Sequence, residues 1–184
     1  VADHGEDLSN FFNANTVVDI FSNNNSTYSN NIDTFSILNQ DGTVNALGSF
    51  GYGGNTNSFF NQLNPNSIKN SKIYSSSSGY VSLRENGSIF IWGGNLASSI
   101  KDQIHNQLNG TVKVVNIFGS NYAFAALKED GSVTTWGSSM FGGDSSSVSS
   151  GINGSVKVTR VITGTNAMAA LRENGSVITW GNTN

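Results

Sequence analysis

One hairpin-like unit recurs four times along the chain. Its clearest copy is residues 124–137 (FAALKEDGSVTTWG), with close copies at residues 80–93 and 168–181 and a weaker one at residues 35–48. The turn glycines lie 45, 44 and 44 residues apart, and the closing glycines and a leucine of each unit keep the same spacing. A fixed period of this length indicates a repeat architecture. The sequence therefore predicts four tandem units of about 44 residues.

Each unit predicts strands joined by a tight turn. Residues 112–118 (VKVVNIF) are rich in β-branched residues, and residues 122–127 (YAFAAL) are apolar on both alternating faces, as in a strand buried on both sides. The Asp130-Gly131 pair is a strong hairpin signal, because glycine accepts positive φ. A polar stretch at residues 138–154 could hold a short outer strand or a helical turn. The expected fold is all-β, with four blade-like repeats in a β-propeller or a propeller-like array.

The first unit departs from the others. Between Phe21 and Leu38 it has eight more positions than the third unit, in an Asn-rich stretch that predicts a surface loop, and Leu47 replaces the tryptophan. The chain opens with a trailing segment and closes just after a hairpin, so the two ends are expected to be complementary halves of one repeat. We assign residues 1–184 to a single repeat domain, with a trailing half-unit at 1–15 and repeats at approximately 16–59, 60–109, 110–153 and 154–184.

The phrase A-L-[KR]-E-[DN]-G-S-V-x-x-W-G resembles the repeat of the regulator of chromosome condensation family. With the Gly-Asp-Ser-Ser segment that begins at Gly143, it is most similar to the short repeats of that type in bacterial secreted and surface proteins. The resemblance implies β-propeller blades stacked around an axis. Family members with nucleotide-exchange activity have seven blades. That activity is not expected here, because the chain has four shorter repeats and no basic histone-binding arm.

Composition excludes several classes of function. Only 11% of residues are charged, the net charge is −3, and the nine basic residues are scattered, which argues against nucleic-acid binding. The absence of cysteine excludes disulfides and thiolate metal sites. Since no apolar run approaches about 18 residues, membrane insertion is not expected. The chain begins with Val and has no signal-like stretch, so we expect either a mature, processed product or a piece of something longer. With the resemblance to bacterial secreted and surface repeats, we expect a secreted or cell-surface microbial protein that is processed from a precursor.

No residue pattern predicts catalysis, a metal site or a cofactor. His4 lies in an acidic leader and His105 in a polar stretch, and we expect both to be solvated. The charged pairs beside the turns are expected at solvated hairpin tips, and the tryptophans of units two to four as core anchors rather than a sugar-stacking ladder. These residues are Arg84, Glu85, Lys128, Glu129, Arg172 and Glu173, and Trp92, Trp136 and Trp180.

Two functions remain open. The first is structural: the N-terminal segment completes the last repeat, in the same molecule or in a neighbouring copy, and contacts that fail to close would give a head-to-tail filament. The candidate assembly residues are Leu8, Phe11, Phe12, Val17, Val18, Ile20, Val177 and Trp180. The alternative is a small propeller binding module that holds a glycan or protein ligand on its loops. Its candidate contacts are Tyr28, Phe50 and Tyr52.

Overall fold

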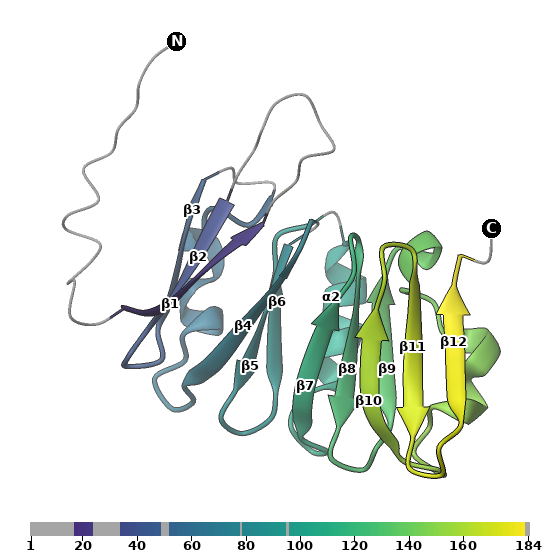
Figure 1. Ribbon diagram of the computed structural model, residues 1–184. Coiled ribbons are helices and arrows are strands. Elements are labelled where there is room, and N and C mark those ends of the chain that lie inside the picture. The colour runs from purple at the N-terminus through teal and green to yellow at the C-terminus, as the bar shows by residue number, and fades with distance from the viewer. Residues whose placement is uncertain (1–16, 24–33, 49–51, 78, 95, 183–184) are drawn as a thin grey trace.

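The computed structural model describes residues 17–23, 34–48, 52–77, 79–94 and 96–182, and these residues form four three-stranded antiparallel sheets (Figure 1). In each sheet the strands follow one another in chain order. This arrangement confirms the predicted all-β, blade-like fold. The strands are β1 (Val17–Asn23), β2 (Thr34–Asn39) and β3 (Val44–Gly48); β4 (Asn70–Ser76), β5 (Gly79–Arg84) and β6 (Ile89–Trp92); β7 (Val114–Gly119), β8 (Ala123–Lys128) and β9 (Val133–Gly137); and β10 (Val158–Thr163), β11 (Ala167–Arg172) and β12 (Val177–Gly181).

The predicted turn joins the second and third strands of every sheet. Its glycine has a φ of +80° to +83° in all four copies, a backbone conformation that side chains disfavour. The residue before the glycine braces the turn. Asp130, for example, accepts hydrogen bonds from the Ser132 amide at 2.9 Å and from the Ser132 hydroxyl at 2.7 Å. The Asp-Gly or Asn-Gly pair thus fixes the hairpin register locally.

The first strand of every sheet carries a β-bulge at the same place. The pairing register shifts between Val17 and Asp19 in β1 and at the corresponding residues of β4, β7 and β10. A bulge increases the local twist of a strand and bends it. One strand shape therefore recurs in all four sheets. The residues that follow the bulge are Asp19, Lys72, Asn116 and Arg160.

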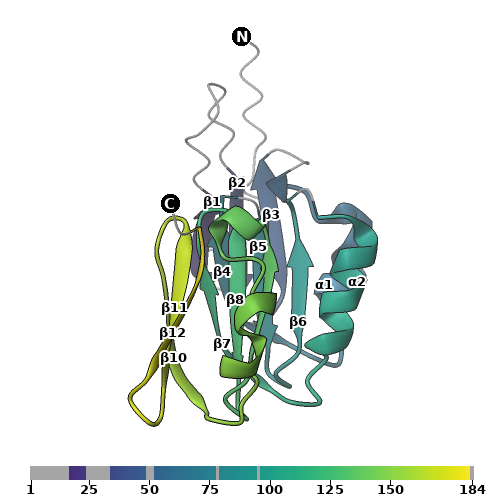
Figure 2. The same ribbon diagram turned by 90° about the vertical axis from the view of Figure 1, so that its right-hand side faces the viewer.

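The polar segments after the third strands are helical. They contain η3 (Asn57–Phe59) and α1 (Phe60–Leu63), then α2 (Ser98–Gln107), then η4 (Ser139–Phe141) and η5 (Ser146–Gly151). In Figure 2 these helices lie beside the sheets, with α1 and α2 next to β6. Among the described residues, the helical option holds and no fourth strand forms. In the second unit α2 follows the point where the first and third units have a Gly-Gly pair.

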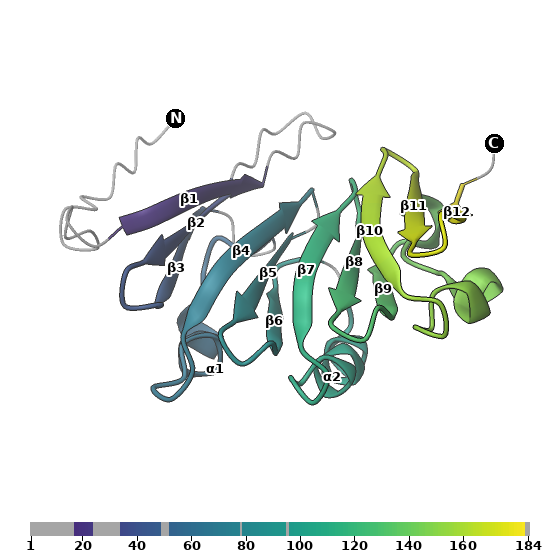
Figure 3. The same cartoon turned by 60° about the horizontal axis from the view of Figure 1, so that its bottom comes forward.

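The sheets stand face to face in a row, with their first strands as neighbours along one side (Figures 1 and 3). Each junction between adjacent sheets has its own apolar cluster. At the first junction, Leu38 and Val44 of the first sheet pack with Ile73, Tyr80 and Trp92 of the second. The two later junctions repeat this arrangement, with Trp136 and Trp180 in the place of Trp92. All three tryptophans are buried, which confirms their prediction as core anchors.

Backbone contacts reinforce each junction at the turns. The carbonyl of Gly131 accepts a hydrogen bond from the Val158 amide of the next sheet at 3.0 Å, and Gly42 and Gly87 do the same for the sheets that follow them. A Cβ atom added to Gly131 would lie 2.5 Å from the Cβ of Lys157. The turn glycine thus serves both its own hairpin and the contact with the next sheet. At Gly175 a Cβ would meet nothing within 4 Å in the part of the chain that the structure describes.

The different surroundings of Gly131 and Gly175 allow the backbone strain of a Gly→Ala substitution to be separated from its steric clash with the next sheet. Gly131→Ala and Gly175→Ala both place a side chain at positive φ, which costs about 1–2 kcal/mol. Gly131→Ala also drives a methyl group into Lys157, and such overpacking costs about 1–3 kcal/mol more. We expect Gly131→Ala to lower the free energy of unfolding by more than Gly175→Ala, as measured by chemical denaturation. Equal losses would contradict a role for the turn glycine at the junction.

Candidate functional site

The outer face of the first sheet exposes side chains that the other sheets bury. Ile20 is 59% exposed, whereas Ile73, at the same position in the second sheet, is 1% exposed. Phe35 is 43% exposed, whereas its counterpart Phe124 is 3% exposed. The internal copies are covered by the preceding sheet. We name this surface, defined by Ile20 and Phe35, the first end face.

The outer face of the fourth sheet also exposes apolar side chains, at the positions that a following sheet covers elsewhere. Val177 is 58% exposed and Leu171 is 41% exposed, although their counterparts in the first three sheets are all buried by the sheet that follows. Gly175, with open space around it, lies in the same sheet. We name this surface, defined by Leu171, Gly175 and Val177, the last end face. The first and last end faces carry the two sides of one junction.

The predicted assembly residues fall into different places. Leu8, Phe11 and Phe12 lie outside the described residues. Ile20 and Val177 lie on the two end faces, and Val17 is half-buried at the start of β1. Val18 is exposed, but so is its counterpart Val115 in an internal sheet, so its exposure does not depend on a missing neighbour.

Trp180 does not contribute to the last end face. It is buried against the third sheet, where its indole N–H donates to the Gly142 carbonyl at 2.9 Å. The tryptophans of units two to four face the preceding sheet, so Trp180 completes an internal junction and is not available to a neighbouring copy.

A polar hollow of about 520 Å³ opens where the first strands end. All four sheets contribute to its lining, mostly through hydroxyl groups, and none of the described lining residues is charged. Two of the hydroxyls make internal hydrogen bonds: Ser120 donates to the Phe141 carbonyl at 2.8 Å and Thr163 to the Gly119 carbonyl at 2.9 Å. The hollow is therefore suited to an uncharged polar ligand. Its lining is Ser22 and residues 75–77, 119–121 and 163–165.

The predicted loop contacts do not form this hollow. Tyr28 and Phe50 lie outside the described residues. Tyr52 is half-buried, and its backbone carbonyl accepts a hydrogen bond from the Thr34 hydroxyl at 3.4 Å. Composition alone could not identify the hollow, because serine and threonine are common along the whole chain.

His105 is not the solvated side chain that we predicted. It lies half-buried on α2, where its Nε2 accepts a hydrogen bond from the Ile91 amide at 3.0 Å and its ring stacks on Phe90. Burial lowers the pKa of His105, and the nearby charge of Arg84 lowers it further. The neutral imidazole thus accepts a hydrogen bond from the backbone of β6. The polar sequence around His105 did not indicate this structural role.

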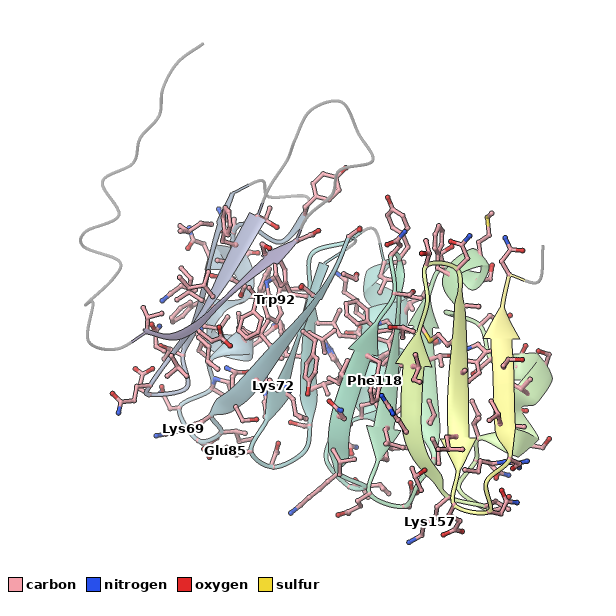
Figure 4. All side chains as sticks on the ribbon, in the orientation of Figure 1. Lys69, Lys72, Glu85, Trp92, Phe118 and Lys157 are labelled. Carbon is pink, nitrogen blue, oxygen red and sulfur yellow. The ribbon has the colours of Figure 1, made fainter. Side chains whose placement is uncertain are left out.

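Arg84 also departs from its prediction as a residue of a solvated hairpin tip. Its guanidinium lies 5.3 Å from the centre of the Phe90 ring and donates a hydrogen bond to the Gln62 carbonyl. Burial lowers the pKa of Arg84. The paired Glu85 is exposed at the rim with Lys69 and Lys157 (Figure 4), as expected for a tip. One pair thus combines a packed cation with a solvated anion.

The described residues contain no group of three or more histidine, cysteine or acidic side chains that could hold a metal ion. Within the same ranges, no helix combines the length and the apolar character that a membrane span requires. His4 lies outside the described residues.

Comparison with known proteins identifies the fold. No protein-family model matches the chain, and no curated protein is a significant match. Among solved structures, the chain is similar to yeast RCC1 (Prp20), at a TM-score of 0.54 and 18% identity over 80% of this chain and 41% of that one. The fold is that of RCC1-like β-propeller repeats. This result confirms the resemblance at the level of fold.

Two further structures have the same relationship to the chain. The ectodomain of the receptor kinase CR4 from Physcomitrella patens matches at a TM-score of 0.52 and 18% identity, over 82% of this chain and 39% of that one. The C-terminal domain of gp131 from bacteriophage phiKZ matches at 0.55 and 12% identity, over 92% of this chain and 53% of that one. The chain thus spans between about two fifths and one half of the length of these proteins.

His105 gives a testable pH dependence. Its folded pKa is lowered, so below its unfolded value of about 6.5 the unfolded chain binds a proton that the folded chain does not. We expect the free energy of unfolding, measured by urea denaturation, to fall as the pH is lowered from 7 to 5. Asp41 titrates at lower pH, because the Thr43 hydroxyl donates to it and lowers its pKa. His105→Gln, which keeps an acceptor for Ile91, should flatten the slope, and the control His4→Gln should retain it. An unchanged slope in His105→Gln would contradict this role.

Proposed function

We propose that the chain is a self-associating structural module, in which the first end face of one copy packs on the last end face of another. One observation supports this proposal most directly. The exposed side chains of the two end faces occupy the positions that form every internal junction. A second copy would place Ile20 and Phe35 against Leu171 and Val177, as Ile73 and Tyr80 lie against Leu38 and Val44. Burial of these apolar groups favours the contact.

The contact joins two different surfaces and is therefore heterologous. Such contacts close into a ring when the rotation between copies allows it, and otherwise continue as a filament. Completion of the last repeat by the N-terminal segment of the same molecule would instead leave a monomer. We also propose a secreted or cell-surface location. Its support is the uncharged polar composition and the resemblance to repeats of bacterial secreted proteins.

A binding module is the second candidate function. The hydroxyl-lined hollow favours it, because all four sheets contribute polar groups to a single concave surface. Yeast Prp20 has protein partners: it is bound to Kap60 in one structure, and its binding to Gsp1p and histones has been described. For this chain we propose a glycan or protein ligand. Loss of binding on a glycan or protein array after Ser75→Phe, with Ser146→Phe as an exposed control, would support this role, and unchanged binding would contradict it.

Self-association can be tested by blocking one end face at a time. Ile20→Asp should block the first end face and Val177→Asp the last, so each variant alone should be monomeric by light scattering. Their mixture should give a 1:1 dimer, because each variant retains the face that the other lacks.

Val115→Asp is the matched control, since Val115 is exposed on an internal sheet. This variant should associate as the wild type does. A wild-type protein that stays monomeric at high concentration would refute the proposal, and so would association by either end-face variant alone.

A further inference from the structure

Two opposite charges occupy equivalent positions at the two ends of the row. Asp19 and Arg160 both follow the bulge. Asp19 lies on β1, the first strand of the first sheet, and Arg160 lies on β10, the first strand of the fourth sheet. Both side chains are exposed. Among the described residues, neither side chain has an ion-pair partner within 4 Å. In the two internal sheets the same position holds Lys72 and Asn116.

The junction between the second and third sheets shows how the post-bulge position can connect neighbouring sheets. The ammonium group of Lys72 lies 5.0 Å from the centre of the Tyr74 ring, and the Tyr74 hydroxyl donates to Oδ1 of Asn116 in the next sheet at 2.8 Å. At the junction between the second and third sheets, the post-bulge residue of one sheet is thus linked to that of the next through Tyr74. Figure 4 shows Lys72 and Phe118 along the first strands that form this side of the molecule.

The Asp19 carboxylate is oriented like the Asn116 amide. Its Oδ1 accepts the Ile20 amide at 2.9 Å, as Oδ1 of Asn116 accepts the Ile117 amide at 3.0 Å. In Asn116 the same oxygen also accepts the hydroxyl of the preceding sheet. An equivalent acceptor is therefore held in place on β1, the edge strand of the first sheet, before any partner binds.

The last sheet lacks the hydroxyl donor but offers a cation. Ile162 stands at the position of Tyr74 and is 54% exposed, so it leaves the acceptor of a following sheet without a hydroxyl partner. Arg160 stands at the position of Lys72. Its long guanidinium can donate to a carboxylate in the next sheet, and a charge-assisted hydrogen bond of this kind is stronger than a neutral one.

We propose that Arg160 of one copy pairs with Asp19 of the next and thereby sets the polarity of assembly. This inference rests on the proposed self-association. First end face on first end face leaves Asp19 without the cation of a last end face, and last on last leaves Arg160 without the carboxylate of a first end face. Only first on last places a carboxylate against a guanidinium, so the charged pair favours this arrangement. The apolar side chains supply affinity, and the charged pair selects the orientation.

Charge reversal tests the pair in the full chain. Asp19→Arg and Arg160→Asp should each weaken self-association by about tenfold at low salt, because each creates a like-charge contact. An equimolar mixture of the two variants should regain association close to the wild type, since both joints in the mixture again combine opposite charges. The measurement is sedimentation velocity over a concentration series, with circular dichroism to show that each variant is folded.

Asp102→Arg is the matched control for Asp19→Arg, because it makes the same change in net charge at an exposed position of α2. It should leave association unchanged. If the wild type associates but the single reversals associate equally well, or if the mixture stays as weak as its components, the charged pair is refuted and the proposed function stands. A monomeric wild type refutes both.

Discussion

A sheet that is apolar on both faces needs a neighbour on each side, and this requirement governs the whole structure. The three apolar clusters lie between sheets, not within them. A three-stranded sheet of this kind therefore has no core of its own. Its stability comes from the junctions, so the row of sheets behaves as a chain of nearest-neighbour contacts. The two end faces are the places where this pattern of burial stops.

The hairpins and their packing could be predicted from the sequence. The Asp-Gly and Asn-Gly pairs encode the turn locally, and the three tryptophans recur where a buried anchor is needed in every junction. The helices beside the sheets were harder to predict. The stretch that contains α2 is polar, and its Gly pair is lost, so the residues left two options open. The structure resolves them in favour of a helix whose Ile104 packs into the second junction, together with Leu108 directly after the helix.

The side chains with unexpected roles owe them to partners far away in the chain. His105 looked solvated because its neighbours in sequence are polar, but its hydrogen-bond partner Ile91 and its stacking partner Phe90 belong to β6. Arg84 packs on the same ring and donates a hydrogen bond to Gln62 of α1. Asp19 and Arg160 are recognised as equivalent positions only from the pairing register at the bulges of the four sheets. The order of residues in the sequence does not show this equivalence.

The recurring junction also bears on how such chains change in length. Each turn glycine offers its carbonyl to the first strand of whichever sheet comes next, and the packing at that boundary is much the same at all three junctions. The unit and the boundary have the same period of about 44 residues. Duplication or deletion of one whole unit would therefore leave every remaining boundary intact, whereas a change of half a unit would leave a sheet without its third strand. In a gene for such a protein, insertions and losses in whole-repeat steps should be tolerated best.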